Sequence, residues 1–151
     1  MAASGAVLAF LEGSGPDGRG RTLFDVLAFD NAALERTHDF IQWLFPLPEP
    51  SGAVPDAPVL SSDEIEAIQS SSLAMCALAA ASDRMLIFYS ATDHWLASSD
   101  HNHLRITRII RSLRLLVGDA EADQFRAAIL SRVQATSAPI SARSQGYWAT
   151  A

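Results

Sequence analysis

The stretch that decides the fold is HNHLRITRIIRSLRLL, residues 101–116. Its apolar side chains recur every three or four residues, so on a helical wheel they share an arc of roughly 120°. They are Ile106, Ile109, Ile110, Leu113, Leu116 and the following Val117. The rest of the surface carries arginines at positions 105, 108, 111 and 114. The pattern predicts an amphipathic helix that buries the apolar arc and turns the arginines to solvent.

Helical patterns with clear start signals occupy most of the remaining chain. We expect helices at residues 22–29, 31–45, 62–69, 73–88, 101–116 and 120–133. Their predicted N-caps are Thr22, Asp30, Ser61, Asp100 or Asn102, and Asp119. Residues 73–88 are nearly apolar on all sides, which favours a central position. No segment alternates as a strand would, so we predict an all-α fold, a compact helical bundle of about six helices.

The chain has the length of one domain, predicted over residues 1–151 with a core at about 20–134. Residues 46–58 are rich in proline and are expected to form a loop wrapped on that domain. The tail, residues 135–151, has little helical signal but contains Tyr147 and Trp148. Two large aromatic residues favour a tail that docks back on the body.

Composition narrows the class of protein. Hydrophobic residues make up 49% of the chain and its formal net charge is −6, with arginine as the only basic residue type apart from histidine. An acidic chain is a poor general binder of nucleic acid. No leader segment is evident, and no apolar run reaches the ~18 residues that a membrane span needs. We therefore expect a cytoplasmic protein without an integral membrane segment or nucleic-acid partner.

Two features have ordinary explanations. Residues 13–21 (GSGPDGRGR) have the glycines of a phosphate-binding loop but lack the preceding strand and the Gly-Lys-Ser/Thr ending, so we expect a flexible turn between two helices. The single cysteine, Cys76, lies in an apolar run with no basic neighbour. It is expected to be a small buried hydrophobic residue in a reducing compartment rather than a nucleophile.

The candidate binding residues fall into two groups. His38, Gln42 and Trp43 lie on the predicted helix 31–45, and His101, His103, Arg105 and Arg108 lie on the helix 101–116. If the two helices pack together, they bring imidazole, amide and guanidinium groups into one cleft, which suits a carboxylate or phosphate. The alternatives are a satisfied core histidine at position 38 and a solvated arginine face.

Other chemistry has weaker signals. There is no serine in a nucleophile-elbow motif, so nucleophilic catalysis lacks a candidate. No metal motif such as HExxH is present, and no cofactor is predicted. If a metal or heme is bound, His38, His101 and His103 are the expected ligands.

Four segments together resemble the conserved region of the opioid growth factor receptor family. They are residues 34–47 (LERTHDFIQWLFPL), 57–60 (APVL), 84–89 (RML followed by FY at 88–89) and the helix 101–116, and they span most of residues 20–130. The resemblance implies a compact helical domain with these segments at its centre.

Animal members are described as receptors for the opioid peptide Met-enkephalin, associated with the nucleus and growth control. They are longer and carry repeats. The short, lysine-free chain looks like a stand-alone bacterial member, and the family's motifs carry no agreed catalytic residues.

Three hypotheses for function follow. The first is a binding module for a peptide or small anionic ligand. In it, Arg105 and Arg108 anchor a carboxylate, and Trp43 and Phe45 give apolar contact. The second is a metal- or heme-dependent enzyme that uses His38, His101 or His103. The third is a protein-interaction subunit without a small ligand. The sequence does not indicate an oligomeric state.

Overall fold

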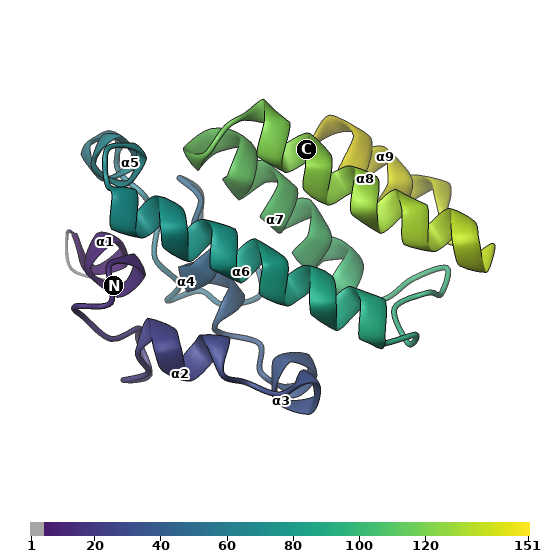
Figure 1. Cartoon of the computed structure of the whole chain (residues 1–151), viewed down its shortest axis with the longest axis horizontal. Coiled ribbons are helices and arrows are strands. Elements are labelled where there is room, and N and C mark those ends of the chain that lie inside the picture. The colour runs from purple at the N-terminus through teal and green to yellow at the C-terminus, as the bar shows by residue number, and fades with distance from the viewer. Residues whose placement is uncertain (1–4) are drawn as a thin grey trace. The chain divides into compact units, whose positions relative to one another are not determined.

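The computed structural model describes residues 5–151, and all regular secondary structure among them is α-helical (Figure 1). The predicted all-α class is therefore confirmed. The described residues form nine helices: α1 (Ala6–Leu11), α2 (Leu23–Leu27), α3 (Asn31–Arg36), α4 (Ile41–Leu44), α5 (Ser62–Gln69), α6 (Ser72–Ala91), α7 (His101–Leu116), α8 (Asp119–Thr136) and α9 (Ala142–Thr150). Three helices exceed the six expected: α1 and α9 were not predicted, and α4 is separate because the predicted helix over residues 31–45 is broken in two.

Residue contacts divide the chain into two compact units, residues 1–81 and 82–151. The boundary falls within α6, so each unit contains part of that helix. The single domain that the sequence suggested stays a prediction.

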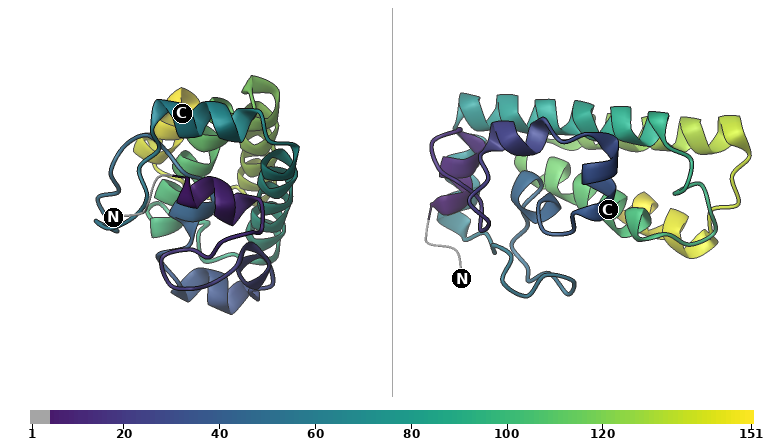
Figure 2. Two further views of the ribbon diagram at one scale, coloured as in Figure 1. Left: turned by 90° about the vertical axis from the view of Figure 1, so that its left-hand side faces the viewer. Right: turned by 90° about the horizontal axis from the view of Figure 1, so that it is seen from below.

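The first unit contains the short helices α1 to α5, joined by loops, and the start of α6, drawn in purple to teal in Figure 2. α1 contacts both α4 and α5. Helices of four to six residues, such as α1 to α4, are not stable alone, so tertiary burial must hold them. The side chains that do so are at most 1% exposed: Phe10, Val26, Leu34, Phe40, Leu44, Phe45 and Ile68.

Side-chain caps fix where these short helices begin. The Thr22 hydroxyl accepts a hydrogen bond from the backbone N–H of Asp25 at 3.1 Å, and Asp25 Oδ2 accepts one from Thr22 N–H at 2.9 Å. The backbone of Thr22, and then its side chain, lower the pKa of Asp25. At α3 and α5, the side chains of Asp30 and Ser61 each accept one hydrogen bond, from the backbone N–H groups of Ala33 and Glu64. The caps predicted at Thr22, Asp30 and Ser61 are confirmed.

The predicted helix over residues 31–45 is wrong, because α3 ends at Arg36 and α4 begins at Ile41. Between them the chain is irregular and Phe40 is completely buried, edge-on to Phe29 with ring centroids 5.8 Å apart. Burying Phe40 outweighs continuing the helix. As a result, His38 is exposed in the connection, and its interpretation as a core histidine on an apolar stripe is also wrong.

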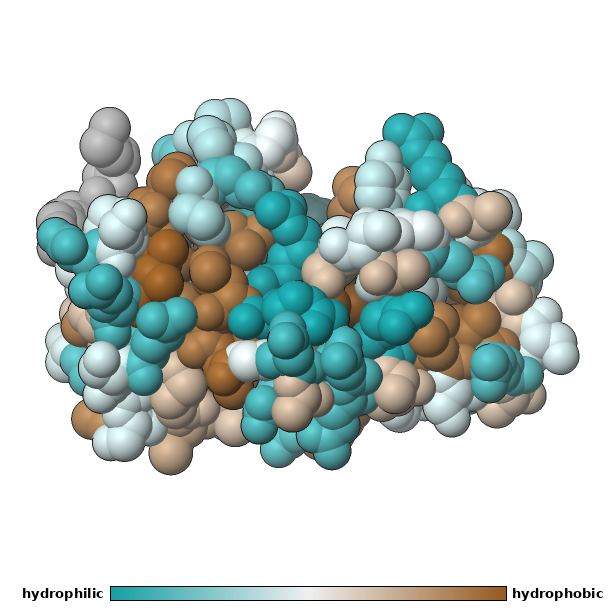
Figure 3. All heavy atoms as spheres, turned by 90° about the horizontal axis from the view of Figure 1, so that it is seen from above, coloured by the Kyte–Doolittle hydropathy of each residue, from teal (hydrophilic) through white to brown (hydrophobic). Residues whose placement is uncertain are grey.

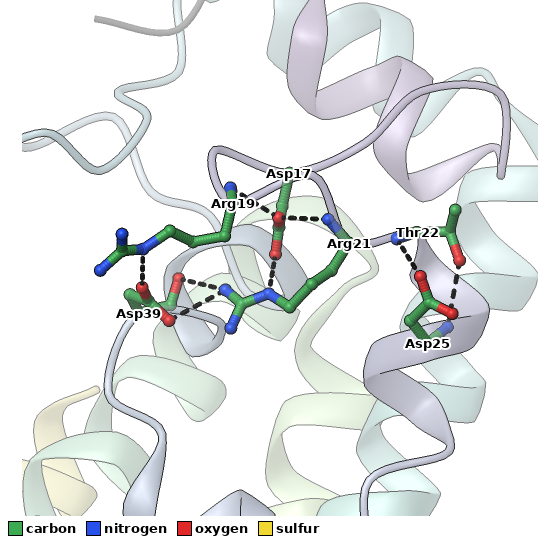
Figure 4. Close-up of polar contacts among 6 residues, drawn as sticks. All are labelled: Asp17, Arg19, Arg21, Thr22, Asp25 and Asp39. Atoms are coloured by element: carbon green, nitrogen blue, oxygen red, sulfur yellow. Dashed lines mark hydrogen bonds and ion pairs between the residues drawn. The ribbon is translucent and has the colours of Figure 1, made fainter.

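The glycine-rich segment joins α1 to α2, as predicted. Its end, residues 17–21, is not a flexible turn but a loop closed by hydrogen bonds to Asp17, here called the Asp17 loop (Figure 4). Asp17 Oδ1 accepts hydrogen bonds from the backbone N–H groups of Arg19 and Arg21, at 2.8 and 3.0 Å. Its Oδ2 lies 2.7 Å from Arg21 Nε, and the Asp17 side chain is fully buried. The backbone N–H groups of this segment are therefore satisfied by its own Asp17 carboxylate.

Asp39, in the connection between α3 and α4, forms ion pairs with two arginines of the Asp17 loop. Its two oxygens lie 2.8 Å from Arg19 Nε and 2.9 Å from Arg21 Nη2. Burial alone would raise the pKa of Asp39, but the hydrogen bonds and positive charges of Arg19 and Arg21 outweigh it and lower that pKa. This pairing gives a second reason why the helix stops before residue 39.

α6 is exposed along one side, which corrects its predicted central position. Leu73 and Ile87 are 61% and 59% exposed, and Cys76 is exposed rather than buried. The opposite side is buried through Ala74, Ala77, Leu78, Ala81, Met85 and Phe88. Alanine is present on both sides of α6 and is tolerated in solvent. The apolar composition of the helix therefore did not predict that one side is exposed. Hydrophobic side chains (brown) also reach the surface in several places on the face drawn in Figure 3.

By length and composition alone, α6 could cross a membrane, and among the described residues no other helix could. Its 18-residue window has a mean hydropathy of 1.3 and is 39% buried. This is weak support for a span, because a core helix of a soluble protein meets the same criteria. The predicted absence of an integral membrane segment stays a prediction.

In the second unit, α7 contacts both α8 and α9, and α9 (yellow) turns back to lie beside α7 (Figures 1 and 2). The predicted apolar arc is buried through Ile106, Ile109, Ile110, Leu113 and Leu116. The arginines do not all face solvent as predicted, because Arg105 is only 6% exposed while Arg111 is exposed. Because both α8 and α9 pack against α7, more of its surface is buried than the division into an apolar and a polar side predicts.

The α7–α8 turn is fixed by glycine geometry and by ion pairs. Gly118 has a φ of 141°, which side-chain-bearing residues rarely adopt, and it is itself the N-cap of α8 in place of the predicted Asp119. Arg114 reaches across the turn to Asp119 at 2.8 Å and Asp123 at 2.7 Å. These hydrogen bonds, first to Asp123 and then to Asp119, raise the pKa of Arg114.

Candidate functional site

A pocket of about 350 Å³ lies within the second unit, where α7 and α9 begin. Ser99 and Asp100 come from the loop before α7, and His101, His103 and Leu104 from its first turn. The remaining lining residues are Ser141, Arg143, Ser144 and Tyr147, at or near the start of α9. The pocket thus combines two imidazoles, a carboxylate, hydroxyl groups, a guanidinium and apolar surface.

His103 is buried beside this pocket and both of its ring nitrogens are engaged. Nε2 lies 2.8 Å from the carbonyl oxygen of Trp95, and Nδ1 lies 2.9 Å from Ser144 Oγ. A carbonyl oxygen only accepts, so we assign the proton of the neutral ring to Nε2. Nδ1 is then an acceptor, and the Ser144 hydroxyl donates to it.

Trp148 holds α9 against the same histidine. Its indole Nε1–H donates to the backbone carbonyl of His103 at 3.0 Å, and the two rings meet edge to face with centroids 5.4 Å apart. Trp148 is 1% exposed. The tail is therefore a helix whose buried aromatic residue contacts α7.

A short chain of hydroxyl groups leads to His103. Ser141 caps α9 by accepting from the backbone N–H of Ser144 at 3.1 Å, and its own hydroxyl donates to Ser144 Oγ at 3.2 Å. The Ser141 backbone N–H donates to the carbonyl of Ser98 at 3.1 Å. These bonds set the position of Ser144 from two sides.

A polar cluster at the start of α7 supports the other side of the pocket. Asp100 is the N-cap, as one of the two predicted alternatives, and its Oδ1 accepts from both the backbone and the side-chain nitrogen of Asn102 at 2.9 Å. Asn102 is fully buried, and its Oδ1 accepts from the Tyr89 hydroxyl at 3.3 Å. The side-chain nitrogen of Asn102 also lies 3.4 and 3.5 Å from Nε2 of His94 and His101. The charge of Asp100 is thus engaged in capping.

The exposed part of the pocket pairs a cation with apolar groups. Arg143 is exposed and its Nε donates to the Tyr147 hydroxyl at 3.4 Å, a hydrogen bond that raises the pKa of Arg143. Leu104 is 68% exposed and Tyr147 is 44% exposed, although both are large hydrophobic residues. Such groups exposed in one pocket are available to contact a ligand.

The structure places the predicted site residues in different parts of the chain. His101 and His103 line the pocket, whereas Arg105 and Arg108 lie further along α7 and do not. His38, Gln42 and Trp43 belong to the first unit, so their convergence with α7 stays a prediction. Within residues 5–151, no group of three or more His, Cys, Asp or Glu side chains is placed to hold a metal ion.

Sequence reasoning missed the pocket residues of α9, namely Ser141, Arg143, Ser144 and Tyr147. They lie some 40 positions after His103 (41 for Ser144), so no local spacing links them to it. The useful signal was the Ser141-to-Ser144 spacing, which is typical of an N-cap, together with the aromatic pair of the tail.

Gln42 has a buried acceptor without a partner. The residue is 4% exposed, and its Oε1 accepts no hydrogen bond in the part of the chain that the structure describes. We expect Gln42→Met to raise the free energy of unfolding by about 1 kcal/mol, because it removes a desolvated amide and keeps the shape of the side chain. Urea denaturation measures this. The exposed Gln124→Met should change stability by less than about 0.5 kcal/mol, and a destabilised Gln42→Met would contradict the assignment.

Fold and site together define a small all-α protein with a polar pocket between two helix starts. The chain belongs to the family described as the opioid growth factor receptor (OGFr) conserved region, which matches residues 19–135. The match includes α7 and ends before α9. The resemblance noted from the sequence is thereby confirmed.

The chain is similar to several curated proteins. It is 36% identical over 115 residues to the opioid growth factor receptor of Rattus norvegicus, covering 64% of this chain and 19% of that protein. For the Homo sapiens receptor the identity is 35% over 115 residues, covering 64% and 16%. For opioid growth factor receptor-like protein 1 of Mus musculus it is 32% over 118 residues, covering 67% and 24%. The chain thus spans a quarter or less of the length of these relatives. No solved structure matches it.

Proposed function

We propose that this chain is a ligand-binding module whose pocket takes the carboxylate end of a peptide or a small anionic molecule with an adjacent apolar group. One observation carries the proposal: Arg143 lies in the same pocket as the exposed Leu104 and Tyr147. A guanidinium suits a carboxylate, and the two hydrophobic side chains suit the group next to it. The names of the relatives, which are receptors, support a binding role.

The size and the polar groups of the pocket narrow the class of ligand. A volume of about 350 Å³ is near the lower end of the ~300–1,000 Å³ usual for ligand sites, so it suits a peptide terminus or a small molecule. His101 adds a polar ring nitrogen, and its side chain is 45% exposed. We place the group that binds the ligand's carboxylate at Arg143 rather than at Arg105 or Arg108, since Arg105 is buried and neither lines the pocket.

The test is a titration of the isotopically labelled full chain with N-acetyl-leucine, followed by NMR. We expect shifts at residues 99–104 and 141–147, and weaker binding of N-acetyl-leucinamide, which lacks the charge. Arg143→Gln should weaken binding of the acid at least about 10-fold, as expected for a charged hydrogen bond. Arg36→Gln, which removes an exposed arginine from the end of α3, is the matched control and should bind as the unmodified chain does. Equal binding of acid and amide, or no shifts at the pocket, would contradict the proposal.

The other hypotheses have less support. In a metal- or heme-dependent enzyme using His38, His101 and His103, the last would first have to break a hydrogen bond, because both of its ring nitrogens are engaged. A protein-interaction subunit without a small ligand leaves the polar pocket without a role. The cytoplasmic location, the bacterial origin and the lack of a cofactor stay predictions.

A further inference from the structure

We propose that Ser144 is an activated nucleophile, with His103 as its general base, and that the pocket hydrolyses small carboxylic esters. This goes beyond ligand binding, and it does not depend on Arg143 binding the carboxylate of a ligand. It gives a role to the buried imidazole, which binding alone leaves unused.

The geometry is that of a nucleophile, a base and a group that orients the base. Ser144 Oγ lies 2.9 Å from His103 Nδ1, within the range for proton transfer. The Trp95 carbonyl, 2.8 Å from Nε2, holds the ring in the tautomer that leaves Nδ1 free of a proton. When the ring is protonated, the same carbonyl accepts from an imidazolium. A nucleophile, a base and an orienting third group are what serine catalysis requires.

Only one serine of the pocket has this arrangement. Ser99, Ser141 and Ser144 all line it, but the structure gives a hydrogen bond to His103 for Ser144 alone among them. Ser141 donates to Ser144 Oγ, which orients the nucleophile and keeps its proton directed at the imidazole. The three hydroxyl groups therefore share one pocket and differ in activation.

The chemistry balances with water as the second reactant. Ser144 Oγ forms a bond to the acyl carbon of the ester while its proton passes to His103 Nδ1. The tetrahedral adduct collapses, the carbon–oxygen bond to the alcohol breaks, and the alcohol leaves with that proton. Water then attacks the acyl-serine in the same way, which releases a carboxylic acid and restores the serine. The positive charge of Arg143 in the same pocket favours the oxyanion of each adduct.

The experiment traps the serine and follows turnover on the full chain. A fluorophosphonate forms an Oγ–P bond with loss of fluoride, and peptide mass spectrometry locates it. We expect the adduct at Ser144 and not at Ser99 or Ser141, together with release of nitrophenolate from p-nitrophenyl acetate. The chain contains no lysine, so acetylation of lysine adds no background.

Two variants test whether Ser144 is labelled because His103 acts as its base or only because its hydroxyl is exposed to solvent. His103→Gln should slow labelling of Ser144 at least about 100-fold, whereas Arg36→Gln, at the exposed end of α3, should leave it unchanged. If His103→Gln does not fold, the comparison of the three serines in the unmodified chain still decides. The proposal is overturned by no adduct, by equal labelling of all three serines, or by labelling that persists in unfolded chain.

Discussion

Replacing Trp148 with alanine is expected to release α9 from α7 and to cost about 3–5 kcal/mol, the range for truncating a buried tryptophan. The side chain is 1% exposed, its indole N–H donates to the His103 carbonyl, and its ring packs on the imidazole. We expect the helix to detach while the rest of the unit stays folded, because this side chain makes the main buried contact between α9 and α7. Hydrogen exchange of residues 138–151 and urea denaturation measure both effects.

The neighbouring aromatic residue supplies the control. Tyr147 is 44% exposed, so Tyr147→Ala should change stability by less than about 1 kcal/mol and leave α9 protected from exchange. Because α9 supplies Arg143 and Ser144, Trp148→Ala should also abolish ligand shifts and labelling at the pocket. Unchanged exchange in α9 of the variant would show that Trp148 does not hold the helix.

Local signals predicted the elements well where a single side chain decides the outcome. The caps at Thr22, Asp30 and Ser61 need only a backbone N–H three residues away, and the apolar arc of α7 needs only its own spacing. The break between α3 and α4 could not be predicted from the local sequence. One of its causes is the pairing of Asp39 with arginines that lie 18 and 20 positions earlier. Tertiary pairing overrode a pattern that is helical by itself.

The candidate site was predictable only in part, for a related reason. His101 and His103 stood out because two histidines open an amphipathic helix. Ser144 did not, because its significance comes only from the 2.9 Å contact with a histidine 41 positions away. Burial of Arg105 was equally hidden, since an arginine on the polar side of a wheel is expected in solvent.

Replacing Asp17 with alanine is expected to lower the free energy of unfolding by about 3–5 kcal/mol, as when one partner of a buried ion pair is removed. The lost carboxylate leaves Nε of the half-buried Arg21 and the backbone N–H groups of Arg19 and Arg21 without their acceptor. Arg21 then also holds Asp39 less firmly, so the connection before α4 should exchange faster. Urea denaturation and hydrogen exchange of residues 17–40 are the measurements.

Asp17→Asn separates closure of the loop from the ion pair. The amide oxygen still accepts from the two backbone N–H groups, whereas the charge opposite Arg21 is gone. We expect Asp17→Asn to lose less stability than Asp17→Ala, because two of the three hydrogen bonds have an acceptor. A loss below about 1 kcal/mol for Asp17→Ala would show that the segment is the flexible turn its glycines suggest. Equal losses for both variants would place the whole effect in the ion pair.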